Sequence, residues 1–214
     1  DVRYGGTISF GKKLADHLRG KIGYTYQHVT IEDVEADAAT SVKLDEGDHD
    51  LGCLSLGFSY RDLDNPYIPS TGWDAGLDVF LYNELLGSDY DFYKASLSAA
   101  RYIRIYTTEA DAHHVLLMHT KVGHMKEMGD TEEVPTFERF YVGGINTVRG
   151  WQPREIGPRE DGDPIGGYFR ATMSMEYYFP LYEDVIYLAA FIDAGGCWPE
   201  VDDFDEDGIR YGTG

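Results

Sequence analysis

The sequence predicts an all-β protein, an antiparallel transmembrane β-barrel. Apolar and polar residues alternate with a period of two in eight segments and in part of a ninth, which is the pattern of β-strands. The connections between these segments are alternately short and long, as in outer-membrane barrels with short periplasmic turns and long external loops. The polar face of the segments is also richer in Gly and Ser than the water-facing side of a soluble β-sandwich usually is.

The composition agrees with this fold class. The 214 residues include 25 Gly and 17 Tyr, which is typical of a chain with many strands and turns. No run approaches the roughly 18 consecutive apolar residues of a transmembrane helix. Hydropathy scans miss transmembrane barrels because only alternate residues face lipid.

The first strand shows the alternation clearly, since Val2, Ile8 and Phe10 alternate with Arg3 and Thr7. The predicted strands are 2–10, 19–27, 53–61, 73–81, 93–99, 116–122, 169–177, 186–193 and 209–211. We expect short connections at 12–17, 62–72, 104–112 and 180–184, with Pro180 closing its strand, and long ones at 28–50, 83–91, 124–167 and 195–208.

The net charge of −20 is concentrated in the long connections. Residues 32–50 contain eight acidic residues and one Lys, and residues 199–208 contain six acidic residues and no Lys or Arg. Such acidity is typical of solvated loops and argues against nucleic acid as a partner.

The longest connection contains the most distinctive stretch of the chain, Phe137 to Glu160. It is too long for a hairpin turn and has too many apolar residues for a disordered segment. Gly143-Gly144 and Gly150 permit sharp turns around Arg149, a permanent cation. We expect this loop to fold into a cavity where Arg149 meets carboxylates; the simpler alternative is a solvated loop arginine. Glu176 and Asp193 lie on the polar face of the next two strands.

The segment Gly143-Gly144-Ile145-Asn146-Thr147-Val148-Arg149-Gly150-Trp151 resembles the G-G-x-x-x-V-R-G-F signature of BamA-type outer-membrane assembly factors. Trp151 stands where the family usually has Phe, and Ile156-Gly157-Pro158 also fits the family pattern. The resemblance implies a 16-stranded barrel of which about eight or nine strands are present. Residues 1–214 are then a partial C-terminal barrel domain with an inward-folding signature loop at 124–167, and the N-terminal periplasmic domains and the last strands lie outside this sequence.

The resemblance also implies the site and the function. The site residues are the loop residues Gly143, Gly144, Val148, Arg149, Gly150 and Trp151, with Glu176 and Asp193 as lumenal partners of Arg149. The implied function is the folding and insertion of β-barrel proteins into the bacterial outer membrane, without covalent chemistry, cofactor or metal. The implied partners are unfolded outer-membrane proteins, assembly-complex lipoproteins, the lipid bilayer and lipopolysaccharide. A TamA-like translocator, a two-partner secretion pore and a passive porin remain alternatives.

Other patterns favour structural interpretations. Asp203, Asp205 and Asp207 match only the opening of a calcium loop, so we expect a solvated acidic loop. We expect Cys53 and Cys197 to be unpaired thiols. We expect a charge network in the lumen, formed by Asp74, Asp78 and Lys94. We expect four histidines to bind no metal: His113, His114, His119 and His124. Aromatic residues near the strand ends are candidates for the aromatic girdles of a barrel: Trp73, Tyr90, Tyr93, Tyr177, Tyr178 and Trp198.

Overall fold

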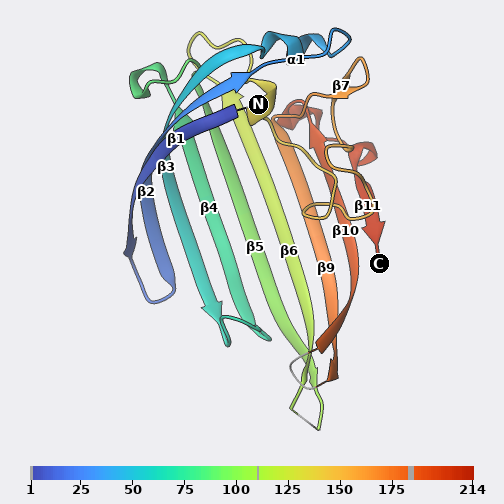
Figure 1. Ribbon diagram of the computed structural model, residues 1–214. Coiled ribbons are helices and arrows are strands. Elements are labelled where there is room, and N and C mark those ends of the chain that lie inside the picture. The colour runs from blue at the N-terminus through green and yellow to red at the C-terminus, as the bar shows by residue number, and fades with distance from the viewer. Residues whose placement is uncertain (1, 110, 183–185) are drawn as a thin grey trace.

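The computed structural model describes residues 2–109, 111–182 and 186–214. Its main feature is a nine-stranded antiparallel sheet in which each strand pairs with its neighbours along the chain (Figure 1). The strands are β1 (Val2–Lys13), β2 (Leu18–Ile31), β3 (Gly47–Leu63), β4 (Gly72–Tyr82), β5 (Phe92–Thr107), β6 (His113–Glu127), β9 (Phe169–Tyr182), β10 (Ile186–Trp198) and β11 (Arg210–Thr213). The predicted all-β antiparallel fold is confirmed.

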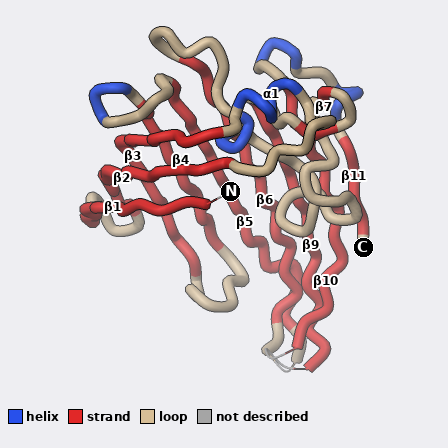
Figure 2. The backbone as a smooth tube through the Cα atoms, turned by 45° about the horizontal axis from the view of Figure 1, so that its top comes forward, coloured by secondary structure: helices blue, strands red, loops and turns tan. Residues whose placement is uncertain are grey.

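The sheet is strongly curved and open. Among the described residues, β1 pairs only with β2 and β11 only with β10, so these two strands are its edges. Seen with its top turned forward, the sheet wraps around the loops that fill its concave side (Figure 2). The long connections gather at one end with α1 (Thr40–Leu44), and the short turns lie at the other.

The two faces of the sheet differ as the alternation predicts. The row Trp73, Arg101, Met118 and Met175 runs across four strands on the convex side. Most large side chains of this face, which we call the outward face, are solvent-exposed in the isolated chain, including Leu97 at 52% and Ile192 at 56%. An apolar surface of this extent fits contact with lipid rather than water.

The strands run further than the alternation indicates. The β2–β3 connection shrinks to residues 32–46, and the signature loop shrinks to residues 128–168 because β6 continues to Glu127. Pro180 does not close its strand: β9 continues to Tyr182, and Pro180 pairs with Tyr187 beside a register shift. Outside the membrane a strand need not alternate, so its ends give no periodic signal. The rest of the predicted turn at 180–184 lies outside the described residues.

The small elements of the signature loop are the 3₁₀ turn η2 (Thr136–Glu138) and the hairpin of β7 (Arg159–Glu160) and β8 (Asp163–Pro164). None of the helical segments in the described part of the chain is long and apolar enough to cross a membrane.

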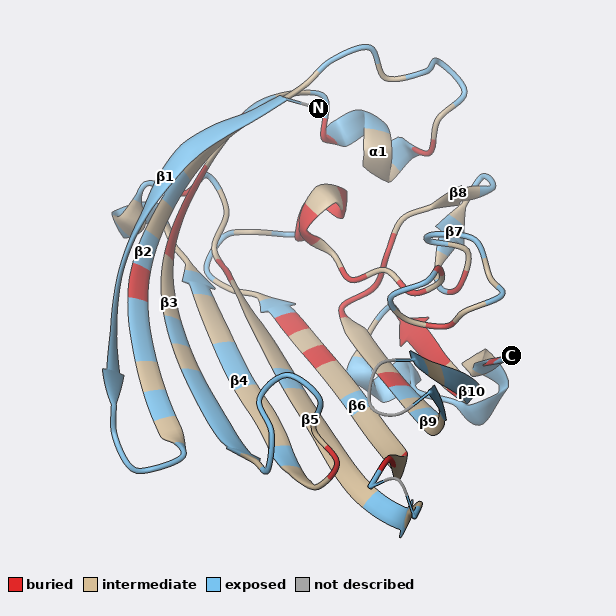
Figure 3. Ribbon diagram, turned by 60° about the horizontal axis from the view of Figure 1, so that its bottom comes forward, coloured by how far each residue is buried: buried red, intermediate tan, exposed pale blue. Residues whose placement is uncertain are grey.

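The buried core lies between the signature loop and the concave face of the sheet (Figure 3). Phe92 and Met125 contribute fully buried side chains from the nine-stranded sheet, which we call the wall. Val134, Val142 and Val148 contribute them from the signature loop. The wall is a single layer, and a single layer cannot bury a core against itself. The loop is therefore the second layer of this fold.

The aromatic-girdle prediction is wrong for three residues. Tyr90 packs against the buried core, and its hydroxyl lies 2.9 Å from His49 Nδ1. Tyr178 points into the concave side, where its hydroxyl donates to Glu176 Oε2, because neighbours in a strand face opposite sides and Tyr177 faces outward. Trp198 is only 4% exposed and packs on Phe169 and Phe204. Trp73, at 47% exposure, lies on the outward face as a girdle residue would.

We expect Leu97→Arg to destabilise the membrane-inserted barrel by about 2–4 kcal/mol, since an arginine on the lipid face is costly near the midplane. Ser96→Arg is the matched control, because Ser96 is on the concave side opposite Asp78. Urea titration of the full-length protein in lipid bilayers measures both. Equal effects of the two substitutions would contradict the assignment of the faces.

Candidate functional site

The signature loop presents Arg149 from a tight local turn. Gly143, Gly144 and Gly150 have φ angles of 115°, 92° and 90°, which side-chain-bearing residues rarely adopt. The Gly144 amide donates to Trp151 O at 3.0 Å and the Gly143 amide donates to Thr147 Oγ1 at 2.8 Å. These contacts close the turn and direct Arg149 toward the sheet.

The structure brings Arg149 together with both predicted carboxylates. Arg149 Nε donates to Asp193 Oδ2 and Nη2 donates to Asp193 Oδ1, each at 2.6 Å. Arg149 Nη2 is also 2.7 Å from Glu176 Oε1 and donates to Ser174 Oγ at 2.9 Å. The Arg149 backbone amide adds a bond to Asp193 Oδ2 at 3.0 Å.

Burial makes this contact strong. The Asp193 side chain is 1% exposed, that of Glu176 16% and that of Arg149 25%. Arg149 Cζ lies 3.5 Å from the ring centre of Phe191, a cation–π contact. The hydrogen bond to Asp193 raises the pKa of Arg149 further above its ordinary value. A two-pronged charge-assisted pair of this kind fixes both position and orientation.

Two glycines of the wall let the loop backbone come this close. A Cβ at Gly212 would lie 1.9 Å from Arg149 O, and one at Gly195 would lie 3.0 Å from Val148 Cγ2. Gly212 is the register partner of Asp193 on the adjacent strand. The absence of side chains at Gly195 and Gly212 therefore lets the loop backbone around Arg149 pack directly against the wall.

Trp151 makes a hydrogen bond through its indole nitrogen, which the phenylalanine usual in the family does not have. Its Nε1 donates to the backbone oxygen of Tyr211 at 2.9 Å. Tyr211 belongs to β11, an edge of the described sheet, so the loop is bonded directly to that edge. A phenylalanine lacks this donor.

A second anchor of the loop was not predicted from the sequence. The ring of Phe140 lies between two cations of the wall, 5.1 Å from Lys94 Nζ and 4.6 Å from Arg170 Cζ. A Cβ at Gly123 would meet this ring at 2.6 Å, so the glycine leaves room for it. Cys197 Sγ donates to Phe140 O at 3.2 Å. An aromatic residue beside the signature was the available signal, but its cationic partners come from distant strands.

Glu138 joins the loop to the other side of the sheet. Lys94 Nζ donates to Glu138 O at 2.6 Å, and Arg3 Nη1 is 3.2 Å from Glu138 Oε1. The predicted charge network is therefore composed differently from our expectation. Lys94 bonds the loop rather than Asp78, and Asp74 pairs with Arg61 at 2.8 Å. Loop carboxylates compete for lumenal cations in a way that strand periodicity cannot indicate.

The β2–β3 connection closes over the loop from the side of the long connections. Asp45 accepts bonds from the amide and hydroxyl of Thr136. Burial raises the pKa of Asp45, although these bonds oppose the shift. The start of α1 is held by the β7–β8 hairpin. Ser41 Oγ donates to Glu160 Oε2 at 2.6 Å, and the amide of Ala39, the residue before α1, donates to Asp163 Oδ2 at 2.9 Å.

The remaining motifs have structural partners. Asp205 Oδ1 accepts from the Gly208 amide at 2.6 Å, and no three candidate metal ligands converge within the described ranges. His114 Nδ1 lies 3.1 Å from the Tyr177 hydroxyl. Cys53 and Cys197 are separate buried thiols, as predicted.

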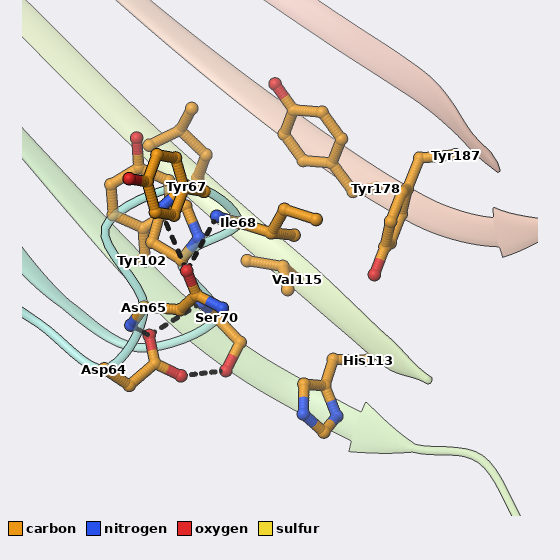
Figure 4. A pocket seen from close by; sticks show the side chains of 12 residues that line it. Asp64, Asn65, Tyr67, Ile68, Ser70, Tyr102, His113, Val115, Tyr178 and Tyr187 are labelled. Atoms are coloured by element: carbon orange, nitrogen blue, oxygen red, sulfur yellow. Dashed lines mark hydrogen bonds between the residues drawn. The ribbon is translucent and has the colours of Figure 1, made fainter. Parts of the chain in front are cut away.

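A cavity of about 420 Å³ lies near the short-turn end, between the turn at residues 64–71 and strands β5, β6, β9 and β10 (Figure 4). Tyrosines form much of its lining, among them Tyr67, Tyr102, Tyr178 and Tyr187. Asp64 Oδ1 accepts from the amides of Ser70 and Thr71, and Arg104 holds the turn through Asp64 at 3.0 Å.

A curved antiparallel sheet that is apolar outside and packs its own loop against its concave face is built like the wall of a membrane β-barrel. The model of the Omp85 superfamily domain matches residues 2–214. The chain therefore belongs to the Omp85 superfamily, and its location is the bacterial outer membrane.

Curated relatives and a solved structure agree. The chain is 32% identical over 199 residues to outer membrane protein assembly factor BamA of Nitratidesulfovibrio vulgaris (strain Hildenborough), covering 89% of this chain and 24% of that protein. It is 30% identical over 153 residues to BamA of Neisseria meningitidis serogroup B, covering 67% and 18%. The crystal structure of Haemophilus ducreyi BamA lacking POTRA domains 1–3 has the same fold, with a TM-score of 0.73, 23% identity and coverage of 98% and 46%. The chain thus spans about a quarter or less of these curated relatives.

We expect Gly123→Ala to loosen the signature loop by about 1–3 kcal/mol, since the added methyl overlaps the Phe140 ring. Gly6→Ala is the control, because a Cβ at Gly6 meets nothing within 4 Å. Limited proteolysis of the loop in the membrane-inserted protein measures the effect. Unchanged protection in Gly123→Ala would show that Phe140 is not an anchor.

The contact between Ser41 and Glu160 should open in acid. The Ser41 bond lowers the pKa of Glu160 from its ordinary 4.5. The contact therefore stabilises the folded loop above pH 4.5, and this stabilisation is lost as the pH falls through the lower folded pKa. The Ser41 amide also donates to Glu160 Oε2, at 3.2 Å, so its hydrogen exchange, corrected for its intrinsic rate, should rise in acid in the wild type. Glu160→Gln should abolish this pH dependence, and persistence of the dependence would contradict the assignment.

Proposed function

We propose that this chain is barrel sequence of an outer-membrane protein assembly factor, which folds and inserts β-barrel proteins into the outer membrane. The curated relatives carry this name, and the family model covers the chain from residue 2 to residue 214. The observation that carries the proposal is the grip of Arg149 on Asp193 and Glu176. In this proposal the protein assists folding and insertion through its conformation, without forming or breaking covalent bonds.

In this proposal the signature loop holds the conformation of the barrel. Gly143, Gly144 and Gly150 shape the turn, and Val148 buries its side chain beside the wall. Arg149 binds the carboxylates of two adjacent strands, and Trp151 bonds a third strand. Because one loop contacts β9, β10 and β11, a change in the relative position of these strands must break a contact.

We further propose that residues 1–214 form part of a 16-stranded barrel that follows N-terminal periplasmic domains. Clients would be unfolded outer-membrane proteins, bound by adding strands to a seam formed by the first and last strands of that barrel. The bilayer with its lipopolysaccharide, and assembly-complex lipoproteins, would be the other partners. The support is the similarity to BamA proteins several times longer than this chain.

Arg149→Ala tests the role of the grip. It leaves the Asp193 carboxylate buried without its cation, and removing one partner of a buried pair costs about 3–5 kcal/mol. We expect the signature loop to become protease-sensitive and the insertion of client barrels into liposomes to fall at least tenfold. The assay uses the full-length protein, with client folding followed by heat-modifiable gel mobility.

Arg154→Ala is the matched control, because Arg154 is an exposed arginine of the same loop that stacks on Tyr141. It should leave client insertion unchanged. A porin would show stable conductance and no client insertion in either variant. Wild-type insertion rates in Arg149→Ala would overturn the proposed role of the loop.

A further inference from the structure

One arginine of the wall lies on the wrong face for a lumenal role. Arg101 is in register with Trp73 on one neighbour and with Met118 on the other. That row continues to Met175 and Ile192, both exposed on the outward face. Arg101 is therefore a charged side chain within the apolar surface that faces lipid.

Arg101 has no carboxylate partner among the described residues. The Arg101 guanidinium lies over Trp73, whose ring centre is 4.8 Å from Arg101 Cζ. Its neighbours along the outward face of β5 are Ala99 and Ile103, which are apolar. Asp62, the nearest acid of the row, is two strands away and 3.7 Å from His17. The guanidinium is thus held by an aromatic ring with its donors available.

The depth of Arg101 follows from strand length. A membrane-spanning strand crosses the hydrocarbon layer in about 9–11 tilted residues. Counted from Phe92, where β5 begins at the long-loop end, that crossing ends near residue 101. Trp73 is the second residue of β4 after a short turn, so it gives the same level. On this count Arg101 lies at the headgroup level of the leaflet on the short-turn side, which is the periplasmic side in outer-membrane barrels.

We propose that Arg101 and Trp73 form a binding site for the phosphodiester of a glycerophospholipid in the periplasmic leaflet. The guanidinium fork matches phosphate oxygens, and it cannot lose its charge in a lipid environment. Trp73 fixes the guanidinium from one side and is itself of the residue type that prefers the headgroup level. The acyl chains would lie along Leu97 and its register partner Val122, on the outward face between the headgroup and the midplane.

Native mass spectrometry of the full-length protein, titrated with phosphatidylglycerol in detergent, tests this site. We expect Arg101→Gln to reduce occupancy by the first bound lipid at least fivefold. Arg101→Met, which keeps an apolar stem, should give the same loss and serves if the glutamine variant folds poorly. Folding of each variant is checked by heat-modifiable mobility.

Arg61→Gln is the matched control, because Arg61 lies one residue from the same row but points to the concave side, where it pairs with Asp74. It should retain the lipid. Millimolar inorganic phosphate should also leave the lipid bound, since the acyl chains contribute to binding. Wild-type occupancy in Arg101→Gln, an equal loss in Arg61→Gln, or displacement by inorganic phosphate would each overturn the proposal.

Discussion

The structure depends on a buried carboxylate that cannot be left alone. Asp193 is almost fully enclosed, and a charge in that position is tolerated only with a hydrogen-bonded cation beside it. Arg149 supplies this cation from a loop rather than from a neighbouring strand. The wall and the loop therefore stabilise each other. Separating them would leave Asp193 without its cation and would expose the apolar side chains that the loop buries against the wall. The apolar contacts of Val148 and Phe140 add to a docking geometry that the ion pair orients.

The anchors of the signature loop are spread over the whole width of the sheet. Glu138 reaches Arg3 on β1, Phe140 rests against β5, β6 and β9, and Trp151 reaches β11. A single curved layer has no second sheet to maintain its curvature, and backbone hydrogen bonds alone permit a range of twist. A loop bonded at both edges acts as a brace across the concave side. The contacts of α1 with Glu160 and Asp163 extend this brace to the β2–β3 connection.

Much of this fold could be predicted from the sequence because lipid on one side and a polar lumen on the other impose a strict period of two on each strand. The same period placed Glu176 and Asp193 on the face that Arg149 reaches, although their role stays a proposal. The ends of the strands escaped prediction because the constraint stops at the membrane boundary, as at Pro180. The partners of Lys94 and Phe140 escaped it because they depend on how a long loop folds, which no local pattern encodes. Tyr178 shows that an aromatic residue near a strand end is not enough to predict a girdle position, because the face of the strand decides whether the side chain meets lipid or the lumen.

The contacts at β11 link the position of this strand to the docked loop. Gly212 admits Arg149 O at a distance that no side chain allows, and Trp151 bonds the carbonyl of the preceding residue. A register slip of one residue would turn Tyr211 toward the loop, and a slip of two in one direction would bring Arg210 beside Arg149. Either slip meets steric overlap or like-charge repulsion. The docked loop therefore disfavours these two slips of β11, and the slip that brings Arg210 beside Arg149 would weaken the ion pair of Arg149. Movement of β11 relative to the docked loop would break the hydrogen bond from Trp151 Nε1 to Tyr211 O, so this bond couples the position of the strand to the docking of the loop.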